Sequence, residues 1–314
     1  MLKFDTLSYE DLFGPTPSSE ALERLRTSLF ESGIVGIRYV PKFVEKVASF
    51  LEAARAFSAL PLDVKNQYAP ERETGDIHGF EFGAEKYNDQ PSDDKKASYY
   101  AFVPDYAKNR WPKEVDLKTP YVDLGLLIGN TARKILNVIG LNEKIGLDLE
   151  KLEFLGRMLH YHKDGDTTNG NPNWAGAHYD HGTFTGLLPA FYFQDGKAVE
   201  EPEEAGLFIR PPKGKDFQKV CAKDTSVLLF QVGEFGQLMS DDRIQATEHV
   251  VRKSFGSIER FTMAVFVDAN PATRCASTSI LTKDPRYCVY PQVDGGITYK
   301  EWGDASYARY LVKK

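Results

Sequence analysis

The sequence has few cysteines, no long apolar run and no cluster of basic residues. Its three cysteines, Cys221, Cys275 and Cys288, are an odd number without CxxC spacing. They indicate free thiols in a reducing compartment and give no sign of a cysteine zinc site. No stretch approaches the roughly 18 apolar residues of a membrane-spanning helix, and the first residues lack the pattern of a secretory signal. We therefore expect a cytoplasmic protein that does not associate with membranes.

Negative charge predominates, with 45 acidic residues against 39 lysines and arginines and a net charge of −6. Because no basic stripe is present to neutralise phosphates, nucleic acid is not expected as a partner. The chain has 314 residues, 42% of them hydrophobic, and can bury a large core. These values are typical of a soluble globular protein. Nothing in the sequence indicates an oligomeric state.

The first half of the chain is predicted to be mostly helical. Apolar residues recur at helical spacing in 18–33, 43–61 and about 120–139, and a short strand is expected at 34–40. The first of these helices begins with serines suited to an N-cap and ends at Gly33. The apolar face of the second is predicted to comprise Val44, Val47, Phe50, Leu51, Ala54 and Phe57.

After about residue 152 the sequence becomes rich in short β-type runs separated by turn residues. They lie at 154–162, 183–193, 206–211, 226–232, 249–253 and 260–269. This pattern predicts a mainly β protein with flanking helices and a sandwich or jelly-roll core. We expect one compact unit with three parts. A helix-rich region (1–150) would pack on the β core (151–270), and a tail (271–314) would help to close the pocket.

The stretch GAHYDHGTFTGLL, at 176–188, contains a candidate metal site. In an extended strand, His178 and Asp180 lie on the same face because the side-chain period is two. His249, on a later β-type run, can supply a third ligand. Two imidazoles and one carboxylate form the facial triad of non-haem Fe(II) oxygenases, which leaves coordination positions open. His181 is the rival ligand, but a regular strand would turn it to the opposite face.

Eleven residues after His249, Arg260 and Thr262 alternate onto one face of another strand. An arginine fork with a hydroxyl beside it suits a carboxylate that is bound bidentately in a buried slot.

The set HxD, distal His and RxT resembles the 2-oxoglutarate/Fe(II)-dependent dioxygenases, specifically their isopenicillin N synthase-like branch. Three further segments are similar to that branch, and they occur in the expected order. They are ARAFSALPLDVKNQYAP at 54–70, NRWP at 109–112, and QVGEFGQLMSDDRIQATEHVV at 231–251. The resemblance covers most of the chain, and it implies a double-stranded β-helix (jelly-roll) core.

The resemblance implies roles for the matching residues. His178, Asp180 and His249 would ligate Fe(II), and Arg260 and Thr262 would hold the distal carboxylate of 2-oxoglutarate. Tyr161 matches the tyrosine of the family's N-x-Y motif and would be a second contact to that carboxylate. Two positions depart from the family pattern. Leu159 stands where the asparagine of N-x-Y would be, and Glu234 replaces the aspartate of a Gly-Asp pair.

The resemblance also implies the reaction. Fe(II), 2-oxoglutarate and O2 would oxidise a small molecule by hydroxylation or desaturation, with release of succinate and CO2. Because Asp180 is present, halogenation is not expected. The alternative is a non-catalytic or 2-oxoglutarate-independent metal-binding protein on the same scaffold, but a decayed site would be expected to have lost a ligand or the arginine.

Candidate substrate contacts are His181, Arg157, Arg210 and Phe184. Arg157 shares the parity of Tyr161, Arg210 matches an arginine of an ethylene-forming relative, and an ordinary structural role is open for each of the four. In this branch the pocket is lined by segments that correspond to 75–88, 163–177 and part of the tail. Their mixture of polar and aromatic residues fits a small polar metabolite, whose identity the sequence does not reveal.

Overall fold

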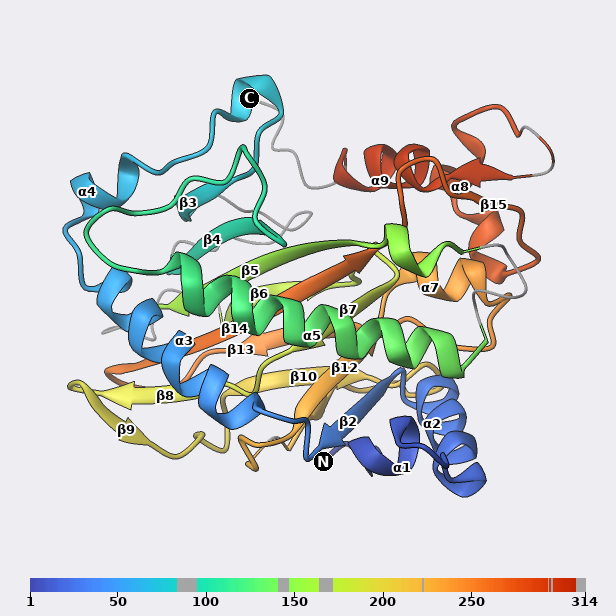
Figure 1. The fold of residues 1–314 in the computed structure, drawn as a ribbon, viewed down its shortest axis with the longest axis horizontal. Coiled ribbons are helices and arrows are strands. Elements are labelled where there is room, and N and C mark those ends of the chain that lie inside the picture. Colours follow the sequence, from blue (N-terminus) through green and yellow to red (C-terminus); the bar gives the residue numbers. More distant parts are fainter. Residues whose placement is uncertain are drawn as a thin grey trace.

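Two facing β-sheets, with helices packed against the outer face of the larger one, make up the architecture (Figure 1). The structure is a computed structural model. It describes residues 1–83, 95–140, 147–163, 172–221, 223–292, 294 and 296–308.

The strands are β1 (Thr6–Ser8), β2 (Ile34–Arg38), β3 (Gly79–Phe82), β4 (Lys96–Val103), β5 (Glu153–Tyr161), β6 (Asn173–His178), β7 (Phe184–Leu187), β8 (Phe191–Gln194), β9 (Lys197–Val199), β10 (Gly206–Arg210), β11 (Gln218–Lys219), β12 (Leu228–Val232), β13 (Glu248–Arg252), β14 (Ile258–Asp268), β15 (Arg274–Cys275) and β16 (Ile297–Thr298). The α-helices are α1 (Tyr9–Phe13), α2 (Ser19–Glu31), α3 (Phe43–Ser58), α4 (Leu62–Asn66), α5 (Lys118–Val138), α7 (Glu234–Met239), α8 (Pro285–Cys288) and α9 (Tyr299–Tyr307). Short 3-10 helices lie at Arg72–Thr74, Leu149–Lys151 and Ile280–Lys283.

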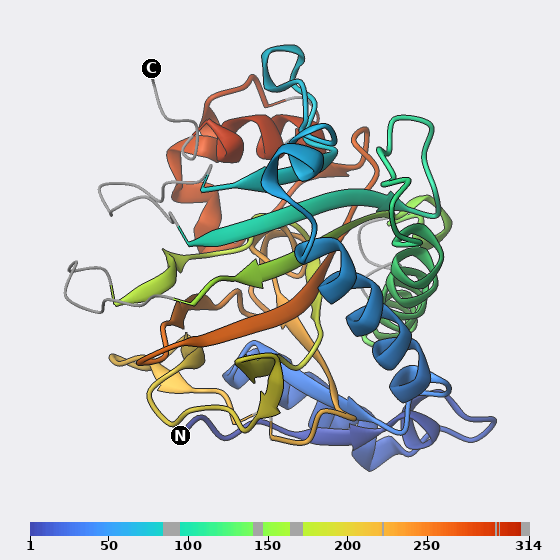
Figure 2. The same cartoon turned by 90° about the vertical axis from the view of Figure 1, so that its left-hand side faces the viewer.

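The larger sheet combines strands from both halves of the chain. Its order is β1-β2-β12-β7-β14-β5-β4-β3, and β8 and β9 extend it beside β14. The smaller sheet has the order β11-β10-β13-β6, and β15 pairs with β16 separately. The long strand β14 pairs with β5 along nine residue pairs and with both β7 and β8 on its other side. In Figure 2 the strands of the larger sheet cross behind α3 and beside α5.

Helix α2 begins and ends where its sequence signals predict. The hydroxyl of Ser18 accepts a hydrogen bond from the backbone N–H of Ala21, which satisfies a donor at the start of the helix. Gly33 ends the helical segment with a φ of +64°, and a Cβ at this position would lie 2.3 Å from the carbonyl oxygen of Gln245. Only glycine is compatible with this turn into β2.

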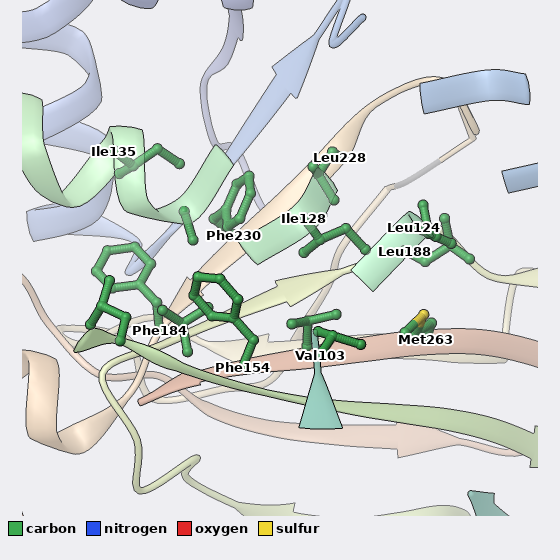
Figure 3. Close-up of a cluster of buried hydrophobic side chains, with 14 of the residues drawn as sticks. Val103, Leu124, Ile128, Ile135, Phe154, Phe184, Leu188, Leu228, Phe230 and Met263 are labelled. Atoms are coloured by element: carbon green, nitrogen blue, oxygen red, sulfur yellow. The ribbon is translucent and has the colours of Figure 1, made fainter. Parts of the chain in front are cut away.

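Helix α5 covers the outer face of the larger sheet. Its apolar residues Leu124, Ile128 and Ile135 are fully buried, and Figure 3 shows them among side chains of the sheet, including Phe154 and Phe230. This layer is the main hydrophobic core. A second, smaller cluster lies between the two sheets and includes Trp174, Tyr192 and Val251.

Because side chains alternate across a strand, the inner face of the larger sheet is fixed by register. Gly156 and Gly186 face α5, since a Cβ on them would meet Tyr121 and Ile128. Their neighbours along the strands therefore point toward the smaller sheet. This alternate set includes Arg157 on β5 and Thr185 on β7, and it forms one wall of the candidate site.

The prediction of a mainly β protein with flanking helices is confirmed. The expected strand and helices of the first half correspond to β2, α2, α3 and α5. One detail of α3 was wrong: Val44 was expected on the buried face but is 60% exposed, because it lies at the edge of the stripe that contacts the sheet. Strand β4 was missed. No helix among the described residues is long and apolar enough to cross a membrane.

Candidate functional site

Three side chains converge between the two sheets. His178 is the last residue of β6, and His249 lies opposite it in the register of β13. Asp180 follows β6 in a loop, rather than lying within the strand as the sequence suggested. Atom Oδ1 of Asp180 lies 3.8 Å from Nε2 of His178 and 3.8 Å from Nε2 of His249. One ligand atom from each of the three residues lies within 4.8 Å of the others, which is the spacing of a mononuclear metal site.

Hydrogen bonds leave one face of the triad available to a metal. Nδ1 of His178 donates to the carbonyl oxygen of Gly176 at 2.7 Å, so Nε2 carries the lone pair. The other carboxylate oxygen of Asp180, Oδ2, accepts from the hydroxyl of Thr185 at 2.6 Å and from the amide of Gln231 at 3.3 Å. Such supporting contacts hold metal ligands in orientation. The donor set and its supports fit a divalent transition metal of the type bound by two imidazoles and one carboxylate.

Burial sets the protonation of these ligands. It lowers the pKa of His178 to about 3, and the neighbouring His249 acts in the same direction. Burial alone would raise the pKa of Asp180, but its interactions with His249 and His178 and the hydrogen bond from Thr185 lower it. At neutral pH the imidazole of His178 is therefore neutral and Asp180 is ionised, which are the forms that ligate a metal.

The triad opens into a cavity between the sheets, with an empty volume of about 830 Å³ including its mouth. The guanidinium of Arg260 lines this cavity and is 6% exposed. Its Nε donates to the hydroxyl of Tyr192 at 3.3 Å, and its Cζ lies 4.8 Å from the centroid of the Tyr161 ring. Atom Nη1 of Arg260 is buried and has no hydrogen-bond partner among the described residues. A buried guanidinium N–H without a partner is costly, and an anionic ligand in the cavity would satisfy it.

The structure places the other predicted anchors beside Arg260. Thr262 and Tyr161 also line the cavity. The hydroxyl of Thr262 donates to the carbonyl oxygen of Leu188 at 2.6 Å, so it can meet a carboxylate as a donor only after rotating. Leu159, which replaces the family asparagine, faces the cavity with an apolar side chain.

The four candidate substrate residues are not gathered at one place. Arg157 lines the cavity, whereas His181, Arg210 and Phe184 do not. The ring of His181 packs against Tyr307 of α9, and burial lowers its pKa to about 4. Arg210 forms an ion pair with Glu248 and lies over the Phe217 ring. Phe184 is fully buried in the cluster beneath α5, as Figure 3 shows.

The sequence-based pocket segments are only partly described. Residues 84–88 and 164–171 lie outside the described residues. Trp174 is 1% exposed and donates to the carbonyl oxygen of His162. No described residue of the tail lines the cavity. Instead, Trp302 of α9 donates to the carbonyl oxygen of His181 at 2.9 Å and so contacts the metal-site loop from outside.

Several residues of the site were missed from the sequence. Thr185 of β7 and Gln231 of β12 contact Asp180. Only the alternation of side chains along these strands could have predicted that they face the site. Lys96 of β4 also lines the cavity, and it is close enough for its charge to contribute to the lowered pKa of His178. The alternation of Lys96, Ser98 and Tyr100 would have indicated a strand face, but the family motifs drew attention to β5 and β14.

Comparison with solved structures shows which proteins share this fold. A candidate 2OG-Fe(II) oxygenase family protein from Caulobacter crescentus superposes with a TM-score of 0.75 over 98% of this chain and 99% of its own, at 20% sequence identity. A full-length Neurospora crassa protein, solved in complex with α-ketoglutarate (2-oxoglutarate), gives a TM-score of 0.71 over 96% and 95% of the two chains, at 16% identity. AtDAO1, a dioxygenase for auxin oxidation from Arabidopsis thaliana in its 2-oxoglutarate complex, gives 0.60 over 85% and 93%, at 13% identity.

No protein-family profile matches the chain, and no curated protein sequence does. The chain therefore has the fold of 2-oxoglutarate/Fe(II) oxygenases across nearly its whole length, and the resemblance stated from its motifs is confirmed at the level of the fold.

Proposed function

We propose that this protein is a non-haem Fe(II) oxygenase that depends on 2-oxoglutarate and oxidises a small organic molecule. In the balanced reaction, one C–H bond of the substrate is hydroxylated, or two hydrogens are removed, while O2 and 2-oxoglutarate are converted to succinate, CO2 and, in the desaturation, water. The observation that carries the proposal is the presence, in one cavity, of the His178–Asp180–His249 triad and of Arg260, whose Nη1 has no hydrogen-bond partner within the described part of the chain.

Each residue has a definite part in this proposal. Nε2 of His178, Oδ1 of Asp180 and Nε2 of His249 would hold Fe(II), which with 2-oxoglutarate and O2 supplies the oxidising power for removal of hydrogen from a C–H bond. Arg260 would bind the distal carboxylate of 2-oxoglutarate bidentately, with the Tyr161 ring beneath it and Thr262 beside it.

The protein also excludes water and orients the reactants. Leu159 and Phe266 of the larger sheet and Val251 of the smaller one give the cavity apolar walls. A dry site strengthens the attraction between Arg260 and a carboxylate. We further propose that the two sheets are the layers of a double-stranded β-helix and that the chain lies in the isopenicillin N synthase-like branch, which its sequence motifs support.

Anaerobic titration of the metal-free protein with Fe(II) and then 2-oxoglutarate tests the proposal. Chelation of the metal by the keto acid should produce a weak visible charge-transfer band. His178→Ala and His249→Ala should abolish iron binding. Arg260→Met should keep the iron but weaken 2-oxoglutarate by a few kcal/mol, roughly a hundredfold or more, because a buried charged pair is broken.

Two outcomes would count against the proposal. Iron binding without the band would favour a 2-oxoglutarate-independent or non-catalytic protein. Equal 2-oxoglutarate affinity in the wild type and in Arg260→Met would show that the anchor is misassigned. Unfolding curves of each variant provide the control for folding.

A further inference from the structure

The guanidinium of Arg260 is connected to Glu201 through the hydroxyl of Tyr192. Nε of Arg260 donates to that hydroxyl at 3.3 Å, and the hydroxyl donates to Oε1 of Glu201 at 3.1 Å. Tyr192 of β8 lies directly opposite Arg260 of β14 in the larger sheet, and Glu201 follows β9, the strand that pairs with β8. Strand pairing therefore brings these three side chains together.

The groups at its two ends determine the direction of this hydrogen-bond chain. A guanidinium has only N–H donors, so the oxygen of Tyr192 accepts from Arg260. Burial raises the pKa of Tyr192, so the hydroxyl retains its own proton and needs an acceptor for it. Glu201 supplies that acceptor. Without it the O–H could turn toward Arg260 and place a donor against a donor, so Glu201 holds the hydroxyl in the orientation that binds Nε.

The chain leaves the other end of Arg260 to a ligand. Nε is occupied by Tyr192, and the ring of Tyr161 lies 4.8 Å from Cζ. Nη1 is buried and has no hydrogen-bond partner within the described part of the chain. Bidentate binding of a carboxylate requires a fixed direction of the two N–H groups. A guanidinium held at Nε is therefore prepared to bind an anion through its Nη atoms.

The negative charge of Glu201 is offset nearby. Glu201 lines the cavity, and on its own this charge would repel a carboxylate bound to Arg260. Nζ of Lys219 lies 3.9 Å from Oε1 of Glu201 and is itself held by the carbonyl oxygens of Pro202 and Glu203. Because this cation compensates the charge, we expect Glu201 to affect a bound anion mainly as a hydrogen-bond acceptor.

The backbone of Gly206 leaves room for the contact between Glu201 and Tyr192. Gly206 is the first residue of β10 and has a φ of +107°. A Cβ at this position would lie 2.1 Å from Oε1 of Glu201 and 3.1 Å from the hydroxyl oxygen of Tyr192. Any other residue would displace the carboxylate from the hydroxyl, so the contact depends on this glycine.

We propose that Glu201 is a positioning residue for the co-substrate, which acts through Tyr192 to fix the guanidinium of Arg260 so that it binds 2-oxoglutarate and discriminates against a longer oxo-diacid. This inference rests on the proposed function, because it assigns Arg260 to 2-oxoglutarate. A fixed guanidinium sets the distance between the metal and the distal carboxylate, whereas a guanidinium that can move would accommodate one more methylene group.

Two substitutions of Glu201 separate its hydrogen bond from its charge. Glu201→Leu removes the acceptor, whereas Glu201→Gln removes the charge and keeps an amide oxygen that can accept from Tyr192. The Fe(II)-loaded proteins are titrated with 2-oxoglutarate under anaerobic conditions, and the visible band is followed. Glu201→Leu should bind 2-oxoglutarate roughly tenfold more weakly, and Glu201→Gln should stay within about threefold of the wild type.

The same titration with 2-oxoadipate, which is one methylene longer, measures discrimination. The wild type and Glu201→Gln should prefer 2-oxoglutarate, and Glu201→Leu should lose at least about threefold of this preference. A purely structural role would lower both affinities together. Glu203→Leu is the matched control, since it removes the same charge from an exposed side chain of the same loop that does not line the cavity.

Tyr192→Phe tests the middle of the chain and does not depend on whether Glu201→Leu folds. It should weaken 2-oxoglutarate by a factor similar to that of Glu201→Leu. In the double variant the two losses should not add, because both residues act on Arg260 through one chain. Fe(II) affinity should be unchanged in all these variants, which shows that the metal site is intact.

The proposal is overturned if Glu201→Leu or Tyr192→Phe binds 2-oxoglutarate as tightly as the wild type, or if their losses add. It is also overturned if Glu201→Leu and Glu201→Gln both bind 2-oxoglutarate more tightly, which is the result expected if only the charge of Glu201 mattered. Failure of the proposed function appears separately, as the absence of the visible band in the wild type.

Discussion

The carboxylate of Glu234 and the guanidinium of Arg286 form a buried bidentate pair, with two hydrogen bonds of 2.6 Å. Both side chains are less than 10% exposed. Glu234 is the first residue of α7, and its backbone N–H donates to the carbonyl oxygen of Asp180 at 2.8 Å. The pair therefore connects the C-terminal part, through α8, to the loop that carries a proposed metal ligand. This ion pair is a structural role for Glu234, the residue that stands where the branch resembled by the sequence has the aspartate of a Gly-Asp pair.

Breaking this pair should strongly destabilise the fold. Glu234→Gln leaves Arg286 with Asp284, at 3.0 Å, as its remaining carboxylate. We therefore expect the free energy of unfolding to fall by about 2–3 kcal/mol, less than for a buried charge left without any partner. Chemical denaturation measures this change. The double variant Glu234→Gln/Arg286→Met removes the incompletely paired cation and should recover part of the loss. A double variant that is no more stable than Glu234→Gln alone would contradict this explanation.

Gln231 should tune metal affinity without binding the metal. Its Nε2 lies 3.3 Å from Oδ2 of Asp180 and 2.9 Å from Nδ1 of His249, so it contacts two of the three proposed ligands. Gln231→Leu should lower Fe(II) affinity roughly ten- to hundredfold, as is typical when a residue that supports metal ligands is removed. Competition with a chelator measures this affinity. Gln194→Leu, at the exposed end of β8, is the matched control and should leave affinity unchanged. A Gln231→Leu protein with wild-type affinity and a normal fold would show that this contact is dispensable.

Asp268 should make the stability of the metal-free protein depend on pH. Burial raises its pKa to about 7, whereas an aspartate in an unfolded chain has a pKa of about 3.9. Between these values the folded state retains a proton that the unfolded state has released. The contribution to stability is therefore fully present below about pH 4, decreases as pH rises, and is lost above about pH 7. Besides burial, the charges of Glu153 and Asp180 raise this pKa, and hydrogen bonds with Tyr299 and the backbone of Thr183 lower it.

Asp268→Asn cannot ionise and should flatten this dependence. Between pH 5 and pH 8 the wild type should lose roughly 1–3 kcal/mol of unfolding free energy relative to the variant. Urea denaturation of both proteins at four pH values in this range provides the measurement. Parallel pH profiles for the two proteins would rule out a raised pKa at this position.

In the N-terminal half, local sequence signals were sufficient to predict the elements whose capping residues and apolar periodicity lie within the segment itself. Helix α2 has a serine N-cap and a terminal glycine, and both act within the segment itself. Strand β4 was missed because KASYYAFV has polar residues at Lys96 and Ser98, which look like solvent-facing positions. In the structure both side chains are buried and Lys96 lines the cavity, and only the tertiary pairing reveals it.

The candidate site, too, was partly predictable from the sequence and partly decided by the tertiary structure. Strand periodicity and motif spacing identified His178, Asp180, His249 and Arg260 from the sequence, because each lies at or near the end of a strand whose face the alternation predicts. Periodicity could not show that Asp180 lies beyond the end of β6, nor that His181 turns to Tyr307 of α9. Those outcomes depend on where the ladder stops and on what packs against the loop.

The sequence alone thus determined the mainly β character, the proposed metal ligands and the arginine of the cavity, because these follow from short-range periodicity and the chemistry of a few side chains. The tertiary structure decided which remaining charges share the cavity. Lys96 and Arg157 are far apart in the chain, yet the pairing of β4 with β5 brings them onto one wall. Pairing between distant strands is a property of the whole sheet, and no local pattern in either strand encodes it.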